Sequence, residues 1–155
     1  MKGNAEVIRV LNDILTAELT AINQYFVHAQ MCENWGYERL YEKIKKESIE
    51  EMKHAEALIE RILFLDGVPN VQRLGKISIG QTVAEQLRLD LDVELDAVKR
   101  LNDGVRLCAR EGDAGSEELL RKILVEEEEH VDLIEAQLVQ IEQMGEAQYL
   151  GQQIG

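Results

Sequence analysis

The distribution of apolar residues along the chain predicts four long amphipathic helices. In four stretches, leucine, isoleucine, valine and alanine recur every three or four residues, which places them on one face of a helix. These stretches cover residues 5–34, 38–65, 82–111 and 113–144. A short amphipathic segment at 146–154 could form a fifth helix. We therefore predict an all-α protein, and its 155 residues are the usual size of a single domain, 1–155.

The segments between these stretches contain residues that end or begin helices. Gly67 and Pro69 follow the second stretch, where glycine suits a left-handed cap and proline cannot continue a helix. Thr82 and Glu85 have the spacing of a capping box at the start of the third. The connection 66–81 is long enough to run the length of a bundle, so that the third helix starts in the direction of the second. Two helical hairpins joined by one long crossover form a ferritin-like four-helix bundle.

Each predicted helix has one glutamate in the middle of its apolar stripe. A single such glutamate would be interpreted as a solvated residue at the edge of the stripe, and this interpretation suits three of the four residues of the acidic run 126–129. Four interruptions at a similar depth indicate one buried cluster instead. Buried carboxylates without a counter-charge are very unfavourable, so they either take up protons or bind cations. The four glutamates are Glu18, Glu51, Glu94 and Glu127.

The same glutamates are part of a motif that occurs twice. Glu51 and His54 form the sequence Glu-x-x-His, and so do Glu127 and His130, a spacing that places both side chains on one face of a helix. In both copies a lone glutamate precedes the pair by the same interval, so that the whole constellation recurs at a fixed offset along the chain. Two single glutamates and two Glu-x-x-His pairs are the ligand set of the carboxylate-bridged dimetal sites known from ferritin-like bundles.

Charge and coordination chemistry favour two divalent ions at this cluster. Four carboxylates carry four negative charges, which two divalent ions neutralise, while neutral histidines add none. One imidazole per ion with several carboxylates suits iron or manganese, although zinc can bind more tightly. Structural zinc sites usually use cysteine and are closed, whereas this set leaves positions open for dioxygen or peroxide. We expect terminal ligands from Glu18 and Glu94, bridging carboxylates from Glu51 and Glu127, and one histidine on each ion, His54 or His130.

The composition argues against several other classes of function. The formal net charge of −13 opposes binding to nucleic acid or to anionic membrane surfaces. No apolar run is long enough to cross a bilayer, and the first residues lack the apolar stretch of a signal peptide. The two cysteines form no disulfide framework, so a reducing, cytoplasmic location is expected.

In its ligand spacing and in several further segments, the chain resembles the bacterioferritins over essentially its whole length. The symmetric pair of Glu-x-x-His motifs distinguishes it from ordinary ferritins, and the lack of any Cys-x-x-Cys distinguishes it from rubrerythrins. The further segments that carry the resemblance are Met1-Lys-Gly, Ala21-Ile-Asn-Gln-Tyr-Phe26, Asn34-Trp-Gly36, Glu51-Met-Lys-His-Ala55, Arg61-Ile-Leu-Phe-Leu65 and Tyr149-Leu150.

The resemblance implies an iron-storage ferroxidase. In such a protein Fe²⁺ is oxidised to Fe³⁺ by dioxygen or hydrogen peroxide at a di-iron centre inside each subunit. The ferric mineral is then stored in the cavity of a homo-oligomeric shell of 24 subunits, which is built from twofold dimers.

Met52 follows a ligand candidate directly, so it points about 100° away from the predicted metals. On general grounds a methionine there would fill a gap or pack at an interface. The resemblance implies another role, as axial ligand of a haem b shared between two subunits, with Leu19, Ile22, Asn23 and Phe26 lining the pocket. It also implies that a small bacterioferritin-associated ferredoxin docks over the haem as electron donor.

Three other residues of the first two helices are candidates for lesser roles. Tyr25 shares a face with Glu18 and is expected either to pack in the core or, by resemblance, to donate an electron during oxidation. Glu47 lies one turn before Glu51 and could pass iron between cavity and site. His28 is a lone polar residue without an evident partner.

Two other functions compete with iron storage. The first is a structural or non-oxidative bundle that binds zinc or manganese. The second is a di-iron oxidase that acts on an organic substrate, although such enzymes need a substrate cavity and are usually larger than this chain.

Overall fold

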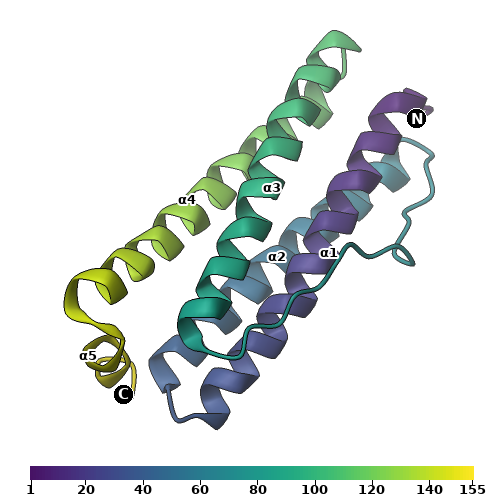
Figure 1. Cartoon of the computed structure of the whole chain (residues 1–155). Coiled ribbons are helices and arrows are strands. Elements are labelled where there is room, and N and C mark those ends of the chain that lie inside the picture. Colours follow the sequence, from purple (N-terminus) through teal and green to yellow (C-terminus); the bar gives the residue numbers. More distant parts are fainter.

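Four long helices lie side by side and a short fifth helix closes one end of them (Figure 1). The computed structural model describes all 155 residues. Its helices are α1 (Ala5–Asn34), α2 (Glu38–Phe64), α3 (Val83–Arg110), α4 (Ala114–Met144) and α5 (Glu146–Gly151). The predicted all-α bundle is therefore confirmed, with α2 one residue and α5 three residues shorter at their ends than expected.

The bundle consists of two antiparallel hairpins joined by one long crossover. Helices α1 and α2 form the first hairpin, α3 and α4 form the second, and the strongest packing lies within each pair. The crossover leaves the end of α2 and runs back along α1, so that α3 starts in the same direction as α2 (Figure 1). This is the topology that the length of the connection predicted.

A row of polar side chains on α1 fixes the path of the crossover. Backbone N–H groups of the crossover donate hydrogen bonds of 2.8 to 3.1 Å to four of these side chains. Arg73 donates to the fifth through Nε, at 3.1 Å. The row recurs every four residues along one face of the helix and consists of Asn12, Thr16, Thr20, Gln24 and His28.

The turn after α2 differs from the one that its glycine suggested. Asp66 adopts the left-handed conformation with a φ of 60°, whereas Gly67 was expected to do so. Gly67 is needed for close packing instead, because a Cβ atom there would lie only 2.8 Å from the side chain of Ile8. Position 67 therefore requires a residue without a side chain, and it does not require a positive φ.

Helix α3 begins with a modified form of the predicted capping box. The hydroxyl of Thr82 accepts a 3.2 Å hydrogen bond from the backbone N–H of Glu85, as expected. The carboxylate of Glu85 accepts from the N–H of Gln81, at 3.2 Å, and not from that of Thr82. The reciprocal bond is thus displaced by one residue.

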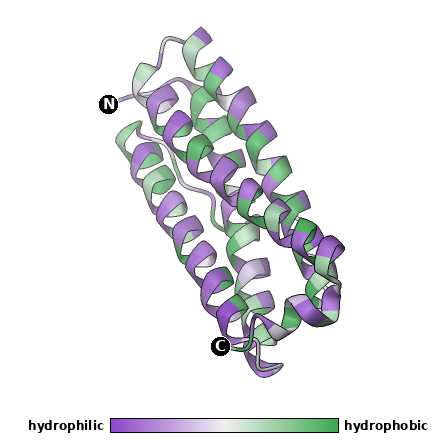
Figure 2. Cartoon of the chain, turned by 90° about the vertical axis from the view of Figure 1, so that its left-hand side faces the viewer, coloured by the Kyte–Doolittle hydropathy of each residue, from purple (hydrophilic) through white to green (hydrophobic).

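The apolar core is divided into two clusters along the length of the bundle. Each cluster contains buried side chains from all four long helices. One cluster lies towards the start of α1 and includes Leu11, Leu58 and Leu101, and the other lies beyond the middle of α1. Hydrophilic and hydrophobic residues alternate along the long helices, as expected when only one face of each helix is apolar (Figure 2). None of the helices is both long and apolar enough to span a membrane.

Candidate metal centre

The four glutamates that interrupt the apolar stripes lie together between the two apolar clusters. Each comes from a different long helix, and each is at most 1% exposed. His54 and His130 follow their glutamates by about one turn on α2 and α4 and are also buried. The helical period thus brings all six side chains of the repeated motif into one cluster.

These six side chains form two overlapping groups. In each group, four ligand atoms lie within 4.8 Å of one another, which is close enough to surround one metal ion. Glu51 and Glu127 belong to both groups, an arrangement that suits carboxylates bridging two ions. The first group adds Glu18 and His54, and the second adds Glu94 and His130.

The two groups are related by approximate twofold symmetry. In both, the histidine Nδ1 atom lies 3.5 Å from the lone glutamate of the group. The distance from Nδ1 to the glutamate of the opposite Glu-x-x-His motif is 3.1 Å in one group and 3.0 Å in the other. The repeat of the motif along the sequence is therefore also a repeat in space.

The cluster contains all the unsatisfied buried polar side-chain atoms of the chain. Nine buried side-chain nitrogen and oxygen atoms have no hydrogen-bond partner, and all nine belong to the six residues. They include the Nδ1 atom of both histidines, since the neighbouring carboxylate oxygens are close but not aligned for a hydrogen bond. Folded proteins rarely leave such atoms unpaired, because each costs about 1 to 3 kcal/mol. This set of donors fits metal ions at the centre of the cluster.

The carboxylates are perturbed in the way expected of a buried anionic cluster. Burial raises the pKa of Glu18 above its ordinary value. Burial raises the pKa of Glu51 and of Glu94 further, and the neighbouring carboxylates add to both shifts. Glu127 is the exception, because interactions with His130 and His54 lower its pKa despite its burial. Protons thus neutralise much of the cluster when no cation does so.

The histidines complement this pattern. Burial alone would lower their pKa values, but interactions with Glu127 and Glu18 raise the pKa of His54 to about 11. Interactions with Glu127 and Glu94 likewise raise the pKa of His130 to about 12. A cation at the centre would take the place of these protons.

Two further glutamates contact the outer nitrogen atoms of the histidines. The Nε2 atom of His54 forms a hydrogen bond with Glu126, and that of His130 forms one with Glu50. The sequence interpretation missed both, and it assigned most of the acidic run that includes Glu126 to solvent. One signal could have found them. Each directly precedes the glutamate of a Glu-x-x-His motif, so the pair repeats along the chain together with the ligand candidates.

Comparison with known proteins agrees with this geometry. The family model for the ferritin-like domain matches residues 8–144. The bacterioferritin of Mycobacterium leprae is 49% identical over 152 residues, which are 98% of this chain and 96% of that protein. Bacterioferritin BfrA of Mycobacterium tuberculosis is 48% identical over the same shares. The bacterioferritin of Streptomyces coelicolor is 47% identical over 97% of this chain and 90% of that protein.

The chain belongs to the bacterioferritin family. The resemblance inferred from the sequence segments is therefore confirmed, and it extends over nearly the whole chain.

Two further candidate residues lie next to the six-residue cluster. Tyr25 is fully buried, and its hydroxyl donates a hydrogen bond to Glu94. Glu47 is nearly buried, and burial raises its pKa to about 7. It lines a polar pocket together with Glu50 and His130. Both candidates are thus within reach of the site.

His28, for which the sequence showed no evident partner, has two partners in the structure. Its Nδ1 atom lies 2.8 Å from the carboxylate of Asp90, and its Nε2 atom accepts a 3.0 Å hydrogen bond from the backbone N–H of Gly80. Gln24 donates to the same carboxylate at 2.9 Å. His28 therefore joins the crossover to α3, a long-range role that the sequence of α1 alone does not indicate.

Met52 lies outside the bundle, as its position in the helix predicted. Its side chain is 55% exposed and lines an apolar groove between α1 and α2 together with Leu19 and Ile22. The other two residues predicted for a haem pocket do not line this groove. Asn23 is exposed and donates to the carbonyl of Leu19, and Phe26 lines a separate pocket further along α1.

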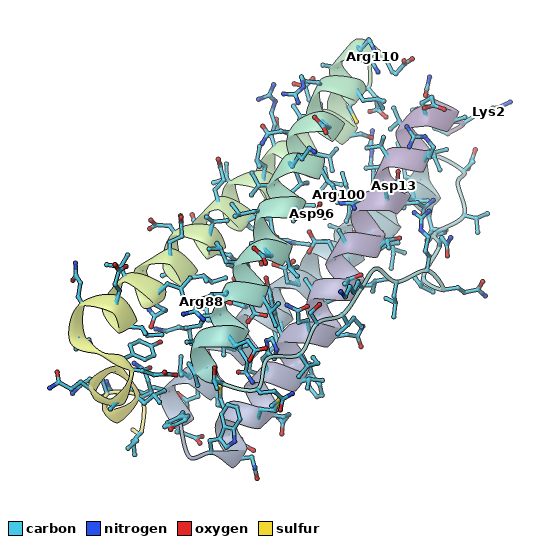
Figure 3. All side chains as sticks on the ribbon, in the orientation of Figure 1. Lys2, Asp13, Arg88, Asp96, Arg100 and Arg110 are labelled. Atoms are coloured by element: carbon cyan, nitrogen blue, oxygen red, sulfur yellow. The ribbon has the colours of Figure 1, made fainter.

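A second charged region of the chain shows what distinguishes the six-residue cluster. Asp13, Asp96 and Arg100 line a groove between α1, α3 and the crossover (Figure 3). Arg100 pairs with Asp96 at 2.6 Å, and Arg73 pairs with Asp13 at 2.6 Å. These carboxylates already have cationic partners within the chain, whereas those of the six-residue cluster share only two histidines.

Proposed function

We propose that this chain is an iron-storage ferroxidase, which oxidises Fe²⁺ at a di-iron centre within each subunit and stores the ferric product in a shell of 24 subunits. The observation that carries the proposal is the cluster of six buried ligand candidates that contains all nine unsatisfied polar atoms. Membership of the bacterioferritin family supports iron as the metal.

The donor set fits two divalent ions. In this proposal Glu51 and Glu127 bridge the ions, Glu18 and His54 complete one site, and Glu94 and His130 complete the other. Four carboxylates balance two Fe²⁺ ions, and each ion gives one electron to dioxygen or hydrogen peroxide. The chain contributes oxygen and nitrogen ligands in a buried pocket, so that the open positions remain available to the oxidant.

Two neighbours have proposed supporting roles. Tyr25 is close enough to supply an electron during oxidation, because its hydroxyl touches Glu94. Glu47 shares a pocket with Glu50 and His130, and its side chain could carry iron between this pocket and the centre. Charged and amide side chains, among them Arg39, Lys43 and Gln137, line the same pocket. This lining suits ions and gives little support to an oxidase for an apolar organic substrate.

Aerobic addition of Fe²⁺ to the purified protein tests the proposal. Ferric absorbance and particle mass are followed together while iron is added in excess of the site. We expect oxidation well beyond two irons per chain, and we expect the ferric iron to remain inside a large particle. Oxidation of only two irons per chain without a large shell would contradict storage. Tight zinc or manganese binding without any iron oxidation would favour the non-oxidative alternative.

We also propose that Met52 ligates a haem b between two copies of the chain. The support is an exposed thioether in a groove whose walls are mostly apolar, which suits the face of a porphyrin. Glu56 and Glu60 lie at the same groove, where they could meet solvent at the edge of the ring. A second copy of the chain would hold the other side of the haem, as the resemblance to the family implies.

Replacing Met52 with leucine is expected to abolish haem binding. Leucine keeps the volume and apolar character of the groove but removes the sulfur ligand. The measurement is the haem absorbance of the protein after reconstitution with haem. Met144→Leu, on a residue outside the groove, is the matched control and should leave the band unchanged. A wild-type protein that shows no haem after reconstitution would rule out this part of the proposal.

A further inference from the structure

Two hydrogen bonds cross the candidate metal centre from one hairpin to the other. Glu126 on α4 contacts the Nε2 atom of His54 on α2, and Glu50 on α2 contacts the Nε2 atom of His130 on α4. Each of these glutamates directly precedes a bridging candidate, Glu127 or Glu51. The two helices therefore exchange partners reciprocally: the Glu-Glu pair of each helix touches the histidine of the other.

These contacts differ from ordinary surface ion pairs. The side chains of Glu126 and Glu50 are 44% and 35% exposed, while the two imidazoles that they contact are nearly buried. Neither glutamate forms an ion pair with any lysine or arginine, although Lys43 and Lys46 line the same pocket as Glu50. Their carboxylates are thus directed at the histidines.

We infer that Glu50 and Glu126 are positioning residues, each of which orients the histidine of the opposite helix for binding one metal ion. A carboxylate accepts hydrogen bonds and does not donate them, so the Nε2 atom of the imidazole must carry the proton. In the neutral ring Nδ1 then presents its lone pair, and Nδ1 is the atom that faces the cluster. Metal-ligating histidines commonly donate their other N–H in this way.

Because the contacts are crossed, a substitution can alter one metal position without altering the other. Glu126 acts on the position formed by Glu18 and His54, and Glu50 acts on the position formed by Glu94 and His130. Loss of either glutamate should therefore weaken one ion and leave the other nearly unchanged. A general loosening of the bundle would weaken both ions together. The inference rests on the proposed dimetal function, and its test must separate the two.

Anaerobic titration of the metal-free protein with Co²⁺ provides that test. The wild-type protein should bind two Co²⁺ per chain, and the absorbance of the ion reports each position. In Glu126→Gln and in Glu50→Gln, we expect one of the two affinities to fall by about 10- to 100-fold. Glu128→Gln on α4 and Glu38→Gln on α2 are the matched controls, since both residues are exposed and neither lines the pocket of Glu50 and His130, so that both affinities should stay unchanged.

Combination with histidine variants tests the crossing itself. In His54→Ala only the position of His130 should bind Co²⁺ tightly. Adding Glu126→Gln to this variant should leave the remaining affinity unchanged, whereas adding Glu50→Gln should weaken it. In His130→Ala the two glutamates should exchange these effects. Such a pattern depends on which histidine each glutamate touches, and a merely structural role would not produce it.

Each outcome bears on a different conclusion. If the wild-type protein binds fewer than two Co²⁺ per chain, the proposed dimetal function is wrong. The inference alone is overturned by either of two results with a wild-type protein that binds two Co²⁺. In the first, both glutamine variants keep wild-type affinities. In the second, both variants weaken binding at the same metal position. Should a glutamine variant fail to fold, Glu126→Asp and Glu50→Asp keep the charge at a shorter reach and should give the same one-ion effect, at smaller magnitude.

Discussion

Replacing Glu127 with alanine is expected to slow Fe²⁺ oxidation by more than about 100-fold, since loss of a partner that only orients a ligand already costs about 10- to 100-fold. Glu127 belongs to both groups of ligand atoms and is buried at the centre of the cluster. Its carboxylate lies 3.1 Å from His54 Nδ1 and 3.5 Å from His130 Nδ1. Alanine therefore removes a ligand from both ions and leaves two histidines without their shared partner.

Initial rates of ferric absorbance, measured on freshly prepared metal-free protein, are the readout for this variant. Glu18→Ala is an informative comparison, because Glu18 belongs to only one group and its loss should leave one ion bound. Glu128→Ala is the control on α4. Because Glu128 is exposed, this variant should oxidise iron at the wild-type rate. Wild-type kinetics in Glu127→Ala, with helical content and particle mass intact, would remove Glu127 from the centre.

Metal binding is expected to release protons and to weaken steeply as the pH falls. The raised pKa values of His54 and His130, about 11 and about 12, mean that both rings are protonated near neutral pH in the metal-free protein. Their Nδ1 protons must leave before the ring can bind an ion. The raised pKa values of Glu18, Glu51 and Glu94 act in the same direction.

The sign and size of this effect follow from linkage. Because the metal-free state holds more protons than the metal-bound state, the affinity rises as the pH rises. Each proton released changes the affinity by about tenfold per pH unit, so the two histidines alone give about 100-fold per unit for the pair of ions. Co²⁺ titrations above and below neutrality, with proton release followed by an indicator dye, measure both quantities. An affinity independent of pH would show that the metal-free ligands are already deprotonated.

Most of the fold could be predicted because periodicity depends only on which residues avoid water. The apolar stripes determined the four long helices to within a residue or two, and the length of the connection indicated the parallel start of α3. The turn after α2 could not be predicted in the same way. Asp66 adopts the left-handed conformation, and Gly67 packs closely against Ile8, a contact with another helix that the local sequence does not reveal.

The same division applies to the candidate site. Glu18, Glu51, Glu94 and Glu127 were visible because each contradicts an apolar stripe, and such a contradiction can be detected within one helix. Glu50 and Glu126 do not interrupt the apolar stripe of their helix, since both are partly exposed. Their partners lie on another helix, and exposed glutamates are common in any amphipathic pattern. His28 was misread for the same reason, because its partners belong to α3 and the crossover.

The two separate apolar clusters provide packing between the four helices that involves none of the candidate metal ligands. Each cluster contains side chains from all four long helices, and the two clusters lie on opposite sides of the central carboxylates. The helices therefore pack against one another on both sides of that layer. In the proposed function, ions would therefore bind and leave in a layer that has apolar packing between all four helices on both sides of it. We therefore expect the metal-free subunit to keep its four-helix packing, because that packing does not require a bound ion.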